Sequence, residues 1–332
     1  MIEIKIEVNM ILAGDIGGTK TLLGLFDAAT VRPRAIATRS FATLDYADLP
    51  SMIAEFLRGT RTRPDAIDRA SFGVAGPVID EGATLTNVPW RIEARGVVAA
   101  FDIGRVFLLN DLEAMAWSVP VLRDAEVHVL QEGEALRGGN IALIAAGTGL
   151  GQALLHWVDG RFAPSPSEGG HADFAARNDR EIALVRDLTT RYGRADVEHV
   201  ISGRGLINIH RVAHAEPCRA VADLGAPDAP AVISQAALDR TCPGCVETLD
   251  MFVDAYGAEA GNLALRTVST GGLFVGGGIA PKILPAMTDG TFMRAFLAKP
   301  PLDAMVAKMP VKIILNAQAG LLGAAVFAAG QR

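Results

Sequence analysis

Residues 13–20 read AGDIGGTK and lie between two apolar runs, residues 10–12 and residues 22–26. This pattern predicts a strand, a tight glycine turn and a second strand. Because glycine has no side chain, the backbone N–H groups of Gly17 and Gly18 can approach a phosphate group closely. The carboxylate of Asp15 can orient a water molecule bound to a metal ion. The stretch therefore predicts a phosphate-binding hairpin.

A second glycine turn has the same setting. Residues 147–151 read GTGLG, after the apolar residues 141–146 and before residues 152–155, which read QALL. After residue 141 the order of strands and turns restarts, which we interpret as an architectural repeat. Two such hairpins in one chain predict two halves that close on one polyphosphate.

Length and composition narrow the class of protein. The chain has 332 residues, of which 50% are hydrophobic, so it is long enough to form two lobes. Its net charge of −6 is spread along the chain without a lysine and arginine cluster, so nucleic acid is not an expected partner. The sequence contains no uninterrupted stretch of about 18 apolar residues, so no membrane span is expected.

The first nine residues alternate charged and apolar side chains, which is unlike a signal peptide. They either extend the first strand or form an appendage, with Met10 as an alternative start. The three cysteines favour a reducing cytoplasm: Cys218, Cys242 and Cys245.

Cys242 and Cys245 form one CxxC pair with Pro243 between them, and proline suits the first turn of a helix. Because no second pair or close histidine accompanies them, we interpret them as unpaired thiols at a helix start. Redox or metal chemistry is the alternative. Five histidines show no shared spacing and are interpreted as packing or surface residues: His128, His156, His199, His210 and His214.

Polar residues follow one predicted strand at its carboxyl end. Residues 106–109 predict a short buried strand, Asn110 and Asp111 follow it, and residues 112–117 predict a helix. Ligands bind at the carboxyl ends of strands in open α/β sheets, so both residues are candidates for a site. From the local sequence alone, Asp111 is more typical of a helix N-cap than of a catalytic group. Further helices are predicted over residues 50–58, 179–192, 202–214, 245–268 and 317–329.

Eight motifs occur in the order in which a known family has them. They are GDIGGT at 14–19, GVAGP at 73–77, LTN at 85–87, LND at 109–111, GTGLG at 147–151, SEGGH at 167–171, Glu198 with VISG at 200–203, and GGGI at 276–279. With these motifs the chain resembles the bacterial ATP-dependent glucokinases of the sugar kinase/actin/Hsp70-like superfamily.

The resemblance implies a two-lobed, actin-like (ribonuclease H-like) α/β fold in which each lobe is a mixed sheet flanked by helices. It implies a small lobe of residues 1–110 and 317–332 and a large lobe of residues 111–316. Substrates would meet in the cleft between the lobes.

For the acceptor side of the site, the resemblance implies that Asp111 is the general base that accepts a hydroxyl proton during phosphoryl transfer. Asn110 is implied as a ligand of sugar hydroxyls. Four further substrate-binding residues are implied: Asn87, Glu168, His171 and Glu198. The last three could instead ligate zinc. The zinc cluster of the related repressor/open-reading-frame/kinase group is not expected, because residues 172–177 contain no cysteine.

For the donor side, the resemblance implies that two glycine turns face the phosphates of ATP and that a third lies under the adenosine. The implied residues are Asp15, Gly17, Gly18, Thr19, Lys20, Thr148, Gly149, Gly276, Gly277 and Gly278. Asp15 would hold Mg²⁺ through a water molecule. Each turn also has a purely structural interpretation, and Lys20 either approaches phosphate or points to solvent.

The implied reaction is transfer of a phosphoryl group from ATP to the 6-hydroxyl of D-glucose, which makes the chain a transferase of glycolysis. We expect a homodimer in the cytoplasm, with ATP and Mg²⁺ as cofactors. Two alternatives stay open: a kinase of the same fold for another hexose or an N-acetylated amino sugar, and a non-catalytic sugar sensor. A sensor needs no general base, so Asp111 argues against it.

Overall fold

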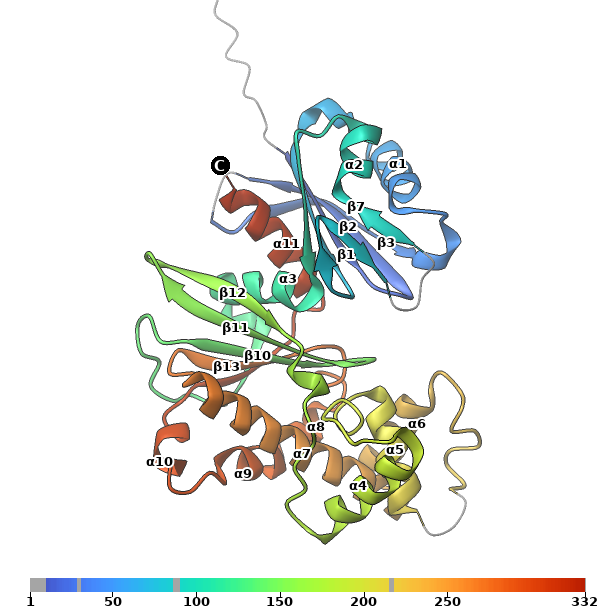
Figure 1. Cartoon of the computed structure of the whole chain (residues 1–332), viewed down its shortest axis with the longest axis vertical. Coiled ribbons are helices and arrows are strands. Elements are labelled where there is room, and N and C mark those ends of the chain that lie inside the picture. Colours follow the sequence, from blue (N-terminus) through green and yellow to red (C-terminus); the bar gives the residue numbers. More distant parts are fainter. Residues whose placement is uncertain (1–9, 29–30, 86–89, 215–217, 332) are drawn as a thin grey trace, which may run out of the picture. The chain divides into compact units, whose positions relative to one another are not determined.

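The computed structural model describes residues 10–28, 31–85, 90–214 and 218–331. Contacts between residues divide the chain into two compact units. The first unit extends to Arg123 and includes the chain from Gln318 onward, and the second unit is Asp124–Ala317 (Figure 1). The boundary that we predicted lies after residue 110, whereas the contacts group Asp111–Ser118 with the first unit.

The first unit is built on a five-stranded mixed sheet in the order β3-β2-β1-β4-β8. β1, β2 and β3 form an antiparallel meander, and β1, β4 and β8 run parallel. A small antiparallel sheet of β5, β6 and β7 accompanies it. The strands are β1 (Met10–Ile16), β2 (Lys20–Asp27), β3 (Arg34–Ala42), β4 (Ile67–Val74), β5 (Val78–Ile79), β6 (Gly82–Thr84), β7 (Arg91–Glu93) and β8 (Arg105–Asn110).

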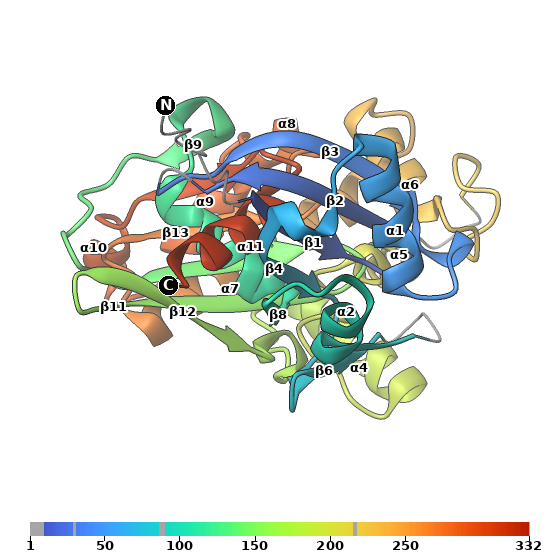
Figure 2. The same ribbon diagram turned by 90° about the horizontal axis from the view of Figure 1, so that it is seen from above.

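Helices cover both faces of this sheet (Figures 1 and 2). α1 and α2 lie on one face, and α3 and α11 lie together on the other. The helices are α1 (Leu49–Thr60), α2 (Ala94–Phe101), α3 (Asp111–Ser118) and α11 (Ala319–Gly330), with short 3₁₀ turns η1 (Thr43–Asp45), η2 (Pro64–Ala66) and η3 (Val119–Val121).

The central strand β1 is buried on both faces, as expected of a strand with helices on either side. Leu12 and Ile16 pack into the core beneath α1, together with Phe56. Ile11 and Ala13 point the other way and pack against α11. The alternation of side chains along a strand therefore places two separate cores around one apolar run.

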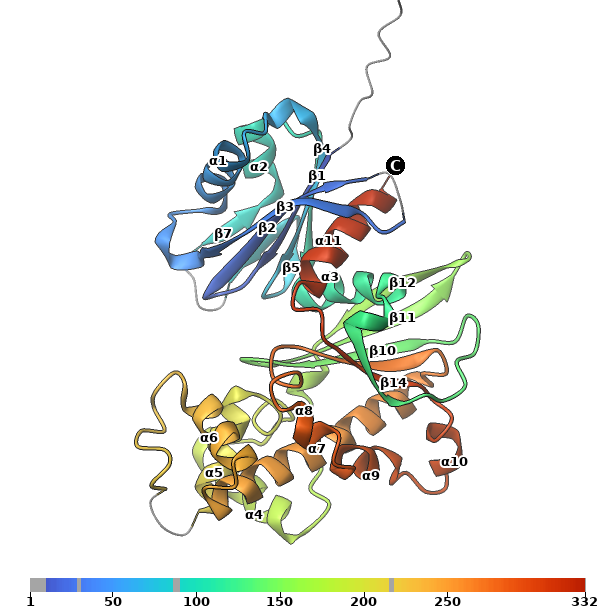
Figure 3. The same ribbon diagram turned by 180° about the vertical axis from the view of Figure 1, so that it is seen from behind.

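The second unit has a six-stranded mixed sheet in the order β12-β11-β10-β13-β14-β9. Its strands are β9 (Val127–Gln131), β10 (Ile141–Ala146), β11 (Leu150–Val158), β12 (Arg161–Ser167), β13 (Gly272–Gly276) and β14 (Val311–Ile314). Its helices are α4 (Asp179–Tyr192), α5 (Gly203–Ala213), α6 (Ala229–Leu238), α7 (Pro243–Thr267), α8 (Leu284–Met287), α9 (Thr291–Leu297) and α10 (Asp303–Val306), with η4 (Asp124–Glu126) and η5 (Gly169–His171). Figure 3 shows α5 and α6 beside one end of the long helix α7.

The two units repeat one strand arrangement, which confirms the predicted architectural repeat. In the first, β1 pairs antiparallel with β2 and parallel with β4. In the second, β10 pairs antiparallel with β11 and parallel with β13. Each central strand thus has an antiparallel hairpin on one side and a parallel neighbour on the other.

The helices that local patterns predicted are present with similar bounds. α4 has the predicted bounds, because the Asn178 side chain accepts a hydrogen bond from the Glu181 N–H at its start and Gly193 ends it in a left-handed conformation. α7 begins at Pro243, two residues before the predicted start. Sequence patterns did not predict α2, α6, α8, α9 or α10, nor the small sheet of β5–β7. Among the described residues, no helix combines the length and apolar character needed to cross a bilayer.

We predict that Gly323→Ala destabilises the first unit, although alanine is the better helix former. Gly323 lies on α11 where it meets α3, and a Cβ atom there would overlap the Ala114 carbonyl oxygen and lie 2.9 Å from the Ser118 nitrogen. The backbone of α3 cannot move aside as a flexible side chain can. We therefore expect the free energy of unfolding to fall by about 1–3 kcal/mol, as measured by urea denaturation. Gly330→Ala is the control, since it meets no atom within 4 Å. A Gly323→Ala protein as stable as this control would contradict the packing.

Candidate active site

Strand register brings two of the predicted residues to the same edge of the first sheet. β1, β4 and β8 pair so that Asp15 lies opposite Gly73, and Ile16, Val74 and Asn110 form the next row. All three strands are parallel, so their carboxyl ends share one edge. β1 and β8 are two strand spacings apart, a distance of about 10 Å. Asp15 and the Asn110–Asp111 junction therefore lie at one edge of the sheet, separated by about that distance.

The turn between β1 and β2 is held closed by hydrogen bonds. The Gly17 N–H donates to the Lys20 carbonyl at 3.1 Å, and the Thr43 hydroxyl donates to the Gly17 carbonyl at 2.8 Å. The Thr43 N–H donates to the Thr19 carbonyl at 3.0 Å. Thr19 and Lys20 are exposed at the tip. Thr43, which the sequence did not single out, thus fixes the shape of the predicted phosphate-binding turn.

The Asp15 carboxyl group is half-buried against the first turn of α11. A Cβ atom on Gly320 would lie 2.8 Å from Asp15 Oδ2, so glycine is needed there for the close approach. Burial raises the pKa of Asp15 to about 6, and the positive charge of Lys20 opposes that rise. Burial therefore makes ionisation of this carboxyl group unfavourable in free energy, and a bound cation would offset that cost. A buried carboxyl group of this kind is typical of a functional site.

The junction of β8 and α3 uses Asn110, not Asp111, as the helix N-cap. The Asn110 side-chain oxygen accepts from the Leu112 and Glu113 N–H groups at 3.0 and 3.3 Å. Its side-chain nitrogen donates to the Gly76 carbonyl at 3.3 Å. The N-cap interpretation of Asp111 is therefore wrong, and much of the hydrogen-bonding capacity predicted for sugar binding by Asn110 serves the helix end.

Asp111 occupies the first position of α3 and is half-buried. Its Oδ1 accepts from the Leu112 N–H at 2.9 Å, which orients the carboxylate. A carboxylate in the first turn is also favoured by the helix dipole. Gly73 lets α3 pack closely on β4, because a Cβ atom there would lie 2.7 Å from Ala114 Cβ.

In the second unit, the predicted turn at residues 147–149 joins β10 to β11. The Gly147 N–H donates to the Gly149 carbonyl at 2.8 Å, and Thr148 is exposed at the tip. The Gly203 N–H, at the start of α5, donates to the Gly147 carbonyl at 2.9 Å. Glu198 Oε2 accepts from the Leu150 N–H at 2.8 Å. A helix start and a carboxylate therefore hold this turn from both sides.

The structure also places Glu198 beside the predicted loop of Glu168 and His171. The Glu198 N–H donates to the Gly170 carbonyl at 2.8 Å, which joins the segment of Glu198 to η5. Glu168 and His171 flank that glycine and are exposed. His171 Nδ1 lies 3.4 Å from Oδ2 of the buried Asp196, which can orient the imidazole. Asp196 is a positioning residue that sequence patterns did not indicate.

The third predicted turn follows β13. Gly277 has φ +85°, and a Cβ atom there would overlap the Ala146 backbone, whereas Gly278 meets no atom within 4 Å. β13 pairs parallel with β10, so this turn and the turn at Gly147 share one edge of the sheet. The hydroxyl of the buried Tyr256 on α7 accepts from the Ala146 N–H at 3.1 Å and lies 3.5 Å from the Gly276 carbonyl. Tyr256, also missed from the sequence, braces both strand ends.

The predicted residues thus form one set in each unit. The first unit assembles Asp15, Gly17, Gly18, Thr19, Lys20, Asn110 and Asp111. The second assembles Thr148, Gly149, Glu168, His171, Glu198, Gly276, Gly277 and Gly278. Asn87 lies outside the described residues. Among the described residues, the atoms of Glu168, His171 and Glu198 do not form a metal-ligand group, so the geometry does not favour the zinc alternative.

Comparison with known proteins identifies relatives over nearly the whole chain. A sequence model of the family described as glucokinase matches residues 12–331. The glucokinase of Nostoc punctiforme is 36% identical over 341 residues, which cover 97% of this chain and 99% of that protein. The crystal structure of glucokinase from an Antarctic psychrotroph has a TM-score of 0.83 and 30% identity, covering 96% of this chain and 98% of that chain.

A more distant structure shares the fold alone. It is a ROK family glucokinase from Streptomyces griseus in complex with glucose and AMPPNP, with a TM-score of 0.64 and 23% identity, covering 96% of this chain and 99% of that chain. Together the likenesses confirm the predicted class, an actin-like sugar kinase fold in which each lobe is a mixed sheet flanked by helices.

We predict that Asp15→Asn stabilises the protein in a pH-dependent way. The pKa of Asp15 in the folded state is about 6, above its ordinary value of 3.8, so ionisation of the carboxyl group destabilises the folded state. This penalty is absent below about pH 4, grows as pH rises and is complete above about pH 6 to 7. The amide should therefore increase the free energy of unfolding by about 1–3 kcal/mol at pH 8 and by little at pH 4, in urea titrations. An equal effect at both pH values would contradict the raised pKa.

Proposed function

The chain belongs to the glucokinase family, and we propose that Asp111 is the general base with which it phosphorylates D-glucose at the 6-hydroxyl, with ATP as donor. One observation carries the assignment. Asp15 and the Asn110–Asp111 junction lie at one carboxyl edge, two strands apart, with Gly73 between them. A phosphoryl group in transfer needs a donor-side anchor and an acceptor-side base at such a separation.

Asp111 accepts the proton of the 6-hydroxyl as the oxygen attacks the γ-phosphorus atom of ATP. The bond from that phosphorus to the bridging oxygen of the β-phosphate breaks, and ADP leaves. Its hydrogen bond from the Leu112 N–H holds the carboxylate in one orientation, and the glycine at position 73 keeps α3 close to the sheet. Asn110 sets the start of α3 through its capping bonds and offers its side-chain N–H₂ group to a neighbouring sugar hydroxyl.

The backbone N–H groups at Gly17, Gly18, Thr148 and Gly149 bind phosphate oxygens of ATP. Thr43 and Glu198 keep the two turns in shape for this role. The open space at Gly278 accommodates the adenosine, which lies on the glycine turn after β13. Lys20, exposed beside the first turn, contributes a positive charge near the phosphates.

Glu168, His171 and Glu198 bind the remaining sugar hydroxyls. Carboxylates accept hydrogen bonds from hydroxyl groups, and an imidazole N–H can donate one, so the set distinguishes the orientation of each hydroxyl. The buried Asp196 holds the His171 ring in position. Asn87, from the LTN motif, is proposed as a further substrate ligand on the family resemblance.

The donor side fits a divalent cation, because Asp15 offers a half-buried carboxylate whose ionisation burial disfavours. Asp15 would hold Mg²⁺ through a water molecule. When bound, Mg²⁺ neutralises charge on the phosphate oxygens. We further propose a homodimer in the cytoplasm that acts in glycolysis. Free cysteines support the reducing compartment, and the dimer rests on family resemblance.

We predict that Asp111→Asn lowers kcat by about 10²- to 10⁴-fold, because the amide cannot accept the hydroxyl proton. Glucose affinity, measured by isothermal titration, should change much less. Asp65→Asn is the matched control, since Asp65 is an exposed carboxylate paired with Arg63 on the surface. Near-normal turnover of Asp111→Asn would remove Asp111 from the role of base.

We predict that Glu168→Ala and His171→Ala each raise the KM for glucose by about tenfold or more, with a smaller effect on kcat. Initial rates in a coupled assay for ADP provide the measurement, and a panel of hexoses and N-acetylated amino sugars tests specificity. Glu134→Ala and His156→Ala serve as controls, since both side chains are exposed in the same unit. An unchanged KM in both site variants would show that the sugar binds elsewhere.

A further inference from the structure

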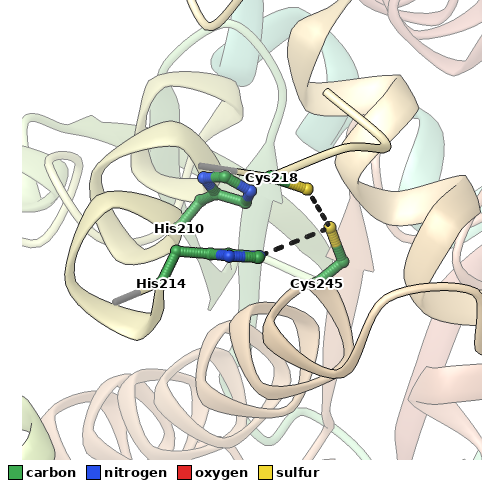
Figure 4. Close-up of side chains that lie close together, drawn as sticks. All are labelled: His210, His214, Cys218 and Cys245. Atoms are coloured by element: carbon green, nitrogen blue, oxygen red, sulfur yellow. Dashed lines mark hydrogen bonds between the residues drawn. The ribbon is translucent and has the colours of Figure 1, made fainter. Parts of the chain in front are cut away.

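Figure 4 shows His210, His214, Cys218 and Cys245 close together, and Cys242 joins them through contacts with Cys218 and His214. From the sequence alone, the thiols are interpreted as unpaired and the histidines as packing or surface residues, and no spacing pattern indicates this cluster. His210 lies in the last turn of α5, and His214 directly follows that helix. Cys242 is the N-cap of α7, and Cys245 is in its first turn. Cys218, from the segment between α5 and α6, completes the group.

The separations between these atoms match the edges of a tetrahedral metal site. Cys218 Sγ lies 3.6 Å from Cys242 Sγ and 3.7 Å from Cys245 Sγ. His214 Nε2 lies 3.4 Å from Cys242 Sγ and 4.0 Å from Cys245 Sγ. Zinc bonds of about 2.3 Å to sulfur and about 2.0 Å to nitrogen give tetrahedral edges of about 3.8 Å between sulfurs and about 3.5 Å between sulfur and nitrogen.

These contacts are too long for a disulfide, whose sulfurs are about 2.0 Å apart. Three sulfur atoms and one imidazole nitrogen also gather around a common centre. Thiols that only fill space in a core do not need such an arrangement. Cys245 is fully buried and Cys218 and Cys242 are half-buried, so the point of convergence is largely screened from water.

We propose that His214 Nε2 and the thiolates of Cys218, Cys242 and Cys245 bind one Zn²⁺ ion. Three thiolates and one imidazole form a closed set of four ligands, which is typical of structural zinc and leaves no open position for a substrate. Soft sulfur ligands favour Zn²⁺ over Mg²⁺, so this site is chemically distinct from the donor side around Asp15.

The neighbouring residues support this ligand set. The His214 ring lies directly over Gly244, where a Cβ atom would overlap the imidazole. Glycine is unfavourable inside a helix, so its position between the two cysteines of the CxxC pair is explained by the approach of the ring. His210 packs on His214 with ring centroids 4.2 Å apart, and neither of its ring nitrogens has a hydrogen-bond partner among the described residues. One of its ring nitrogens lies within 4.8 Å of the ligand atoms of His214, Cys218 and Cys245, so His210 is the competing candidate for the nitrogen ligand. His214 is favoured, because its Nε2 lies 3.4 Å from Cys242 Sγ and 4.0 Å from Cys245 Sγ.

The site joins the two helices that brace the glycine turns of this unit. α5 begins at Gly203, which binds the turn at Gly147, and α7 carries Tyr256, which binds Ala146. A metal ion that links the end of α5 to the start of α7 restricts their relative movement. The zinc ion is therefore a structural cross-link between α5 and α7 in the second unit. This role does not depend on the assignment of the sugar substrate or of the general base.

Metal content tests the proposal directly. The full chain, purified under reducing conditions and incubated with Zn²⁺ before desalting, should contain about one zinc per chain by plasma mass spectrometry. Cys218→Ser, Cys242→Ser and His214→Ala should each reduce this to less than about a tenth. His156→Ala, which changes an exposed histidine on β11, should retain it. Retention of zinc by His214→Ala together with its loss in His210→Ala would overturn the assignment of the fourth ligand.

Two further measurements cover the case in which a cysteine variant does not fold. Titration of the metal-free wild-type chain with Co²⁺ should produce thiolate-to-metal charge-transfer bands and the intense visible absorption of tetrahedral Co²⁺ at one equivalent. Gly244→Ala keeps all four ligands but pushes the His214 ring away, so it should weaken Co²⁺ binding by about tenfold or more. Gly96→Ala, a helical glycine with no atom within 4 Å, is its control.

Absence of both zinc and the Co²⁺ bands in folded wild-type protein would overturn the proposal. So would a Cys218–Cys242 disulfide in freshly prepared protein that holds no metal. Normal Co²⁺ affinity in Gly244→Ala would contradict the placement of the His214 ring.

Discussion

The parallel pairing of a central strand with its neighbour is the constraint on which both halves of the site depend. In the first unit, the register of β1, β4 and β8 sets Asp15 and Asn110 at one edge, and Asp111 follows at the start of α3. In the second, the pairing of β10 with β13 brings two glycine turns to one edge. Backbone hydrogen bonds within a sheet are stiff, so polar groups at these ends are held without long side chains.

Short-range patterns were sufficient to predict these edges. An apolar run followed by adjacent glycines and a second apolar run specifies a hairpin locally, and both predicted hairpins are present. The sequence around Asp111 also predicted a helix that begins directly after a buried strand, and the structure has this helix. Its N-cap is Asn110 and not Asp111. The local sequence does not separate the two residues well, because both side chains accept from the Leu112 N–H and only Asn110 also reaches the Glu113 N–H.

The residues that shape the site could not be predicted in this way, because their partners are distant in sequence. Thr43 closes a turn formed by residues 17–20, and Tyr256 reaches Ala146 across 110 positions. The thiol and imidazole of Cys242 and His214 are separated by 28 positions and meet only because α5 packs against α7. A search for closely spaced ligands does not detect such a group, whereas the folded chain shows it directly.

The central claim is that these two edges serve one phosphoryl transfer to glucose. The most direct measurement is the initial rate of the purified full chain with ATP, Mg²⁺ and D-glucose, following ADP and glucose 6-phosphate together. The account predicts saturable turnover that depends on glucose and yields the two products in equal amounts. No formation of glucose 6-phosphate by folded protein at saturating ATP and glucose would contradict it.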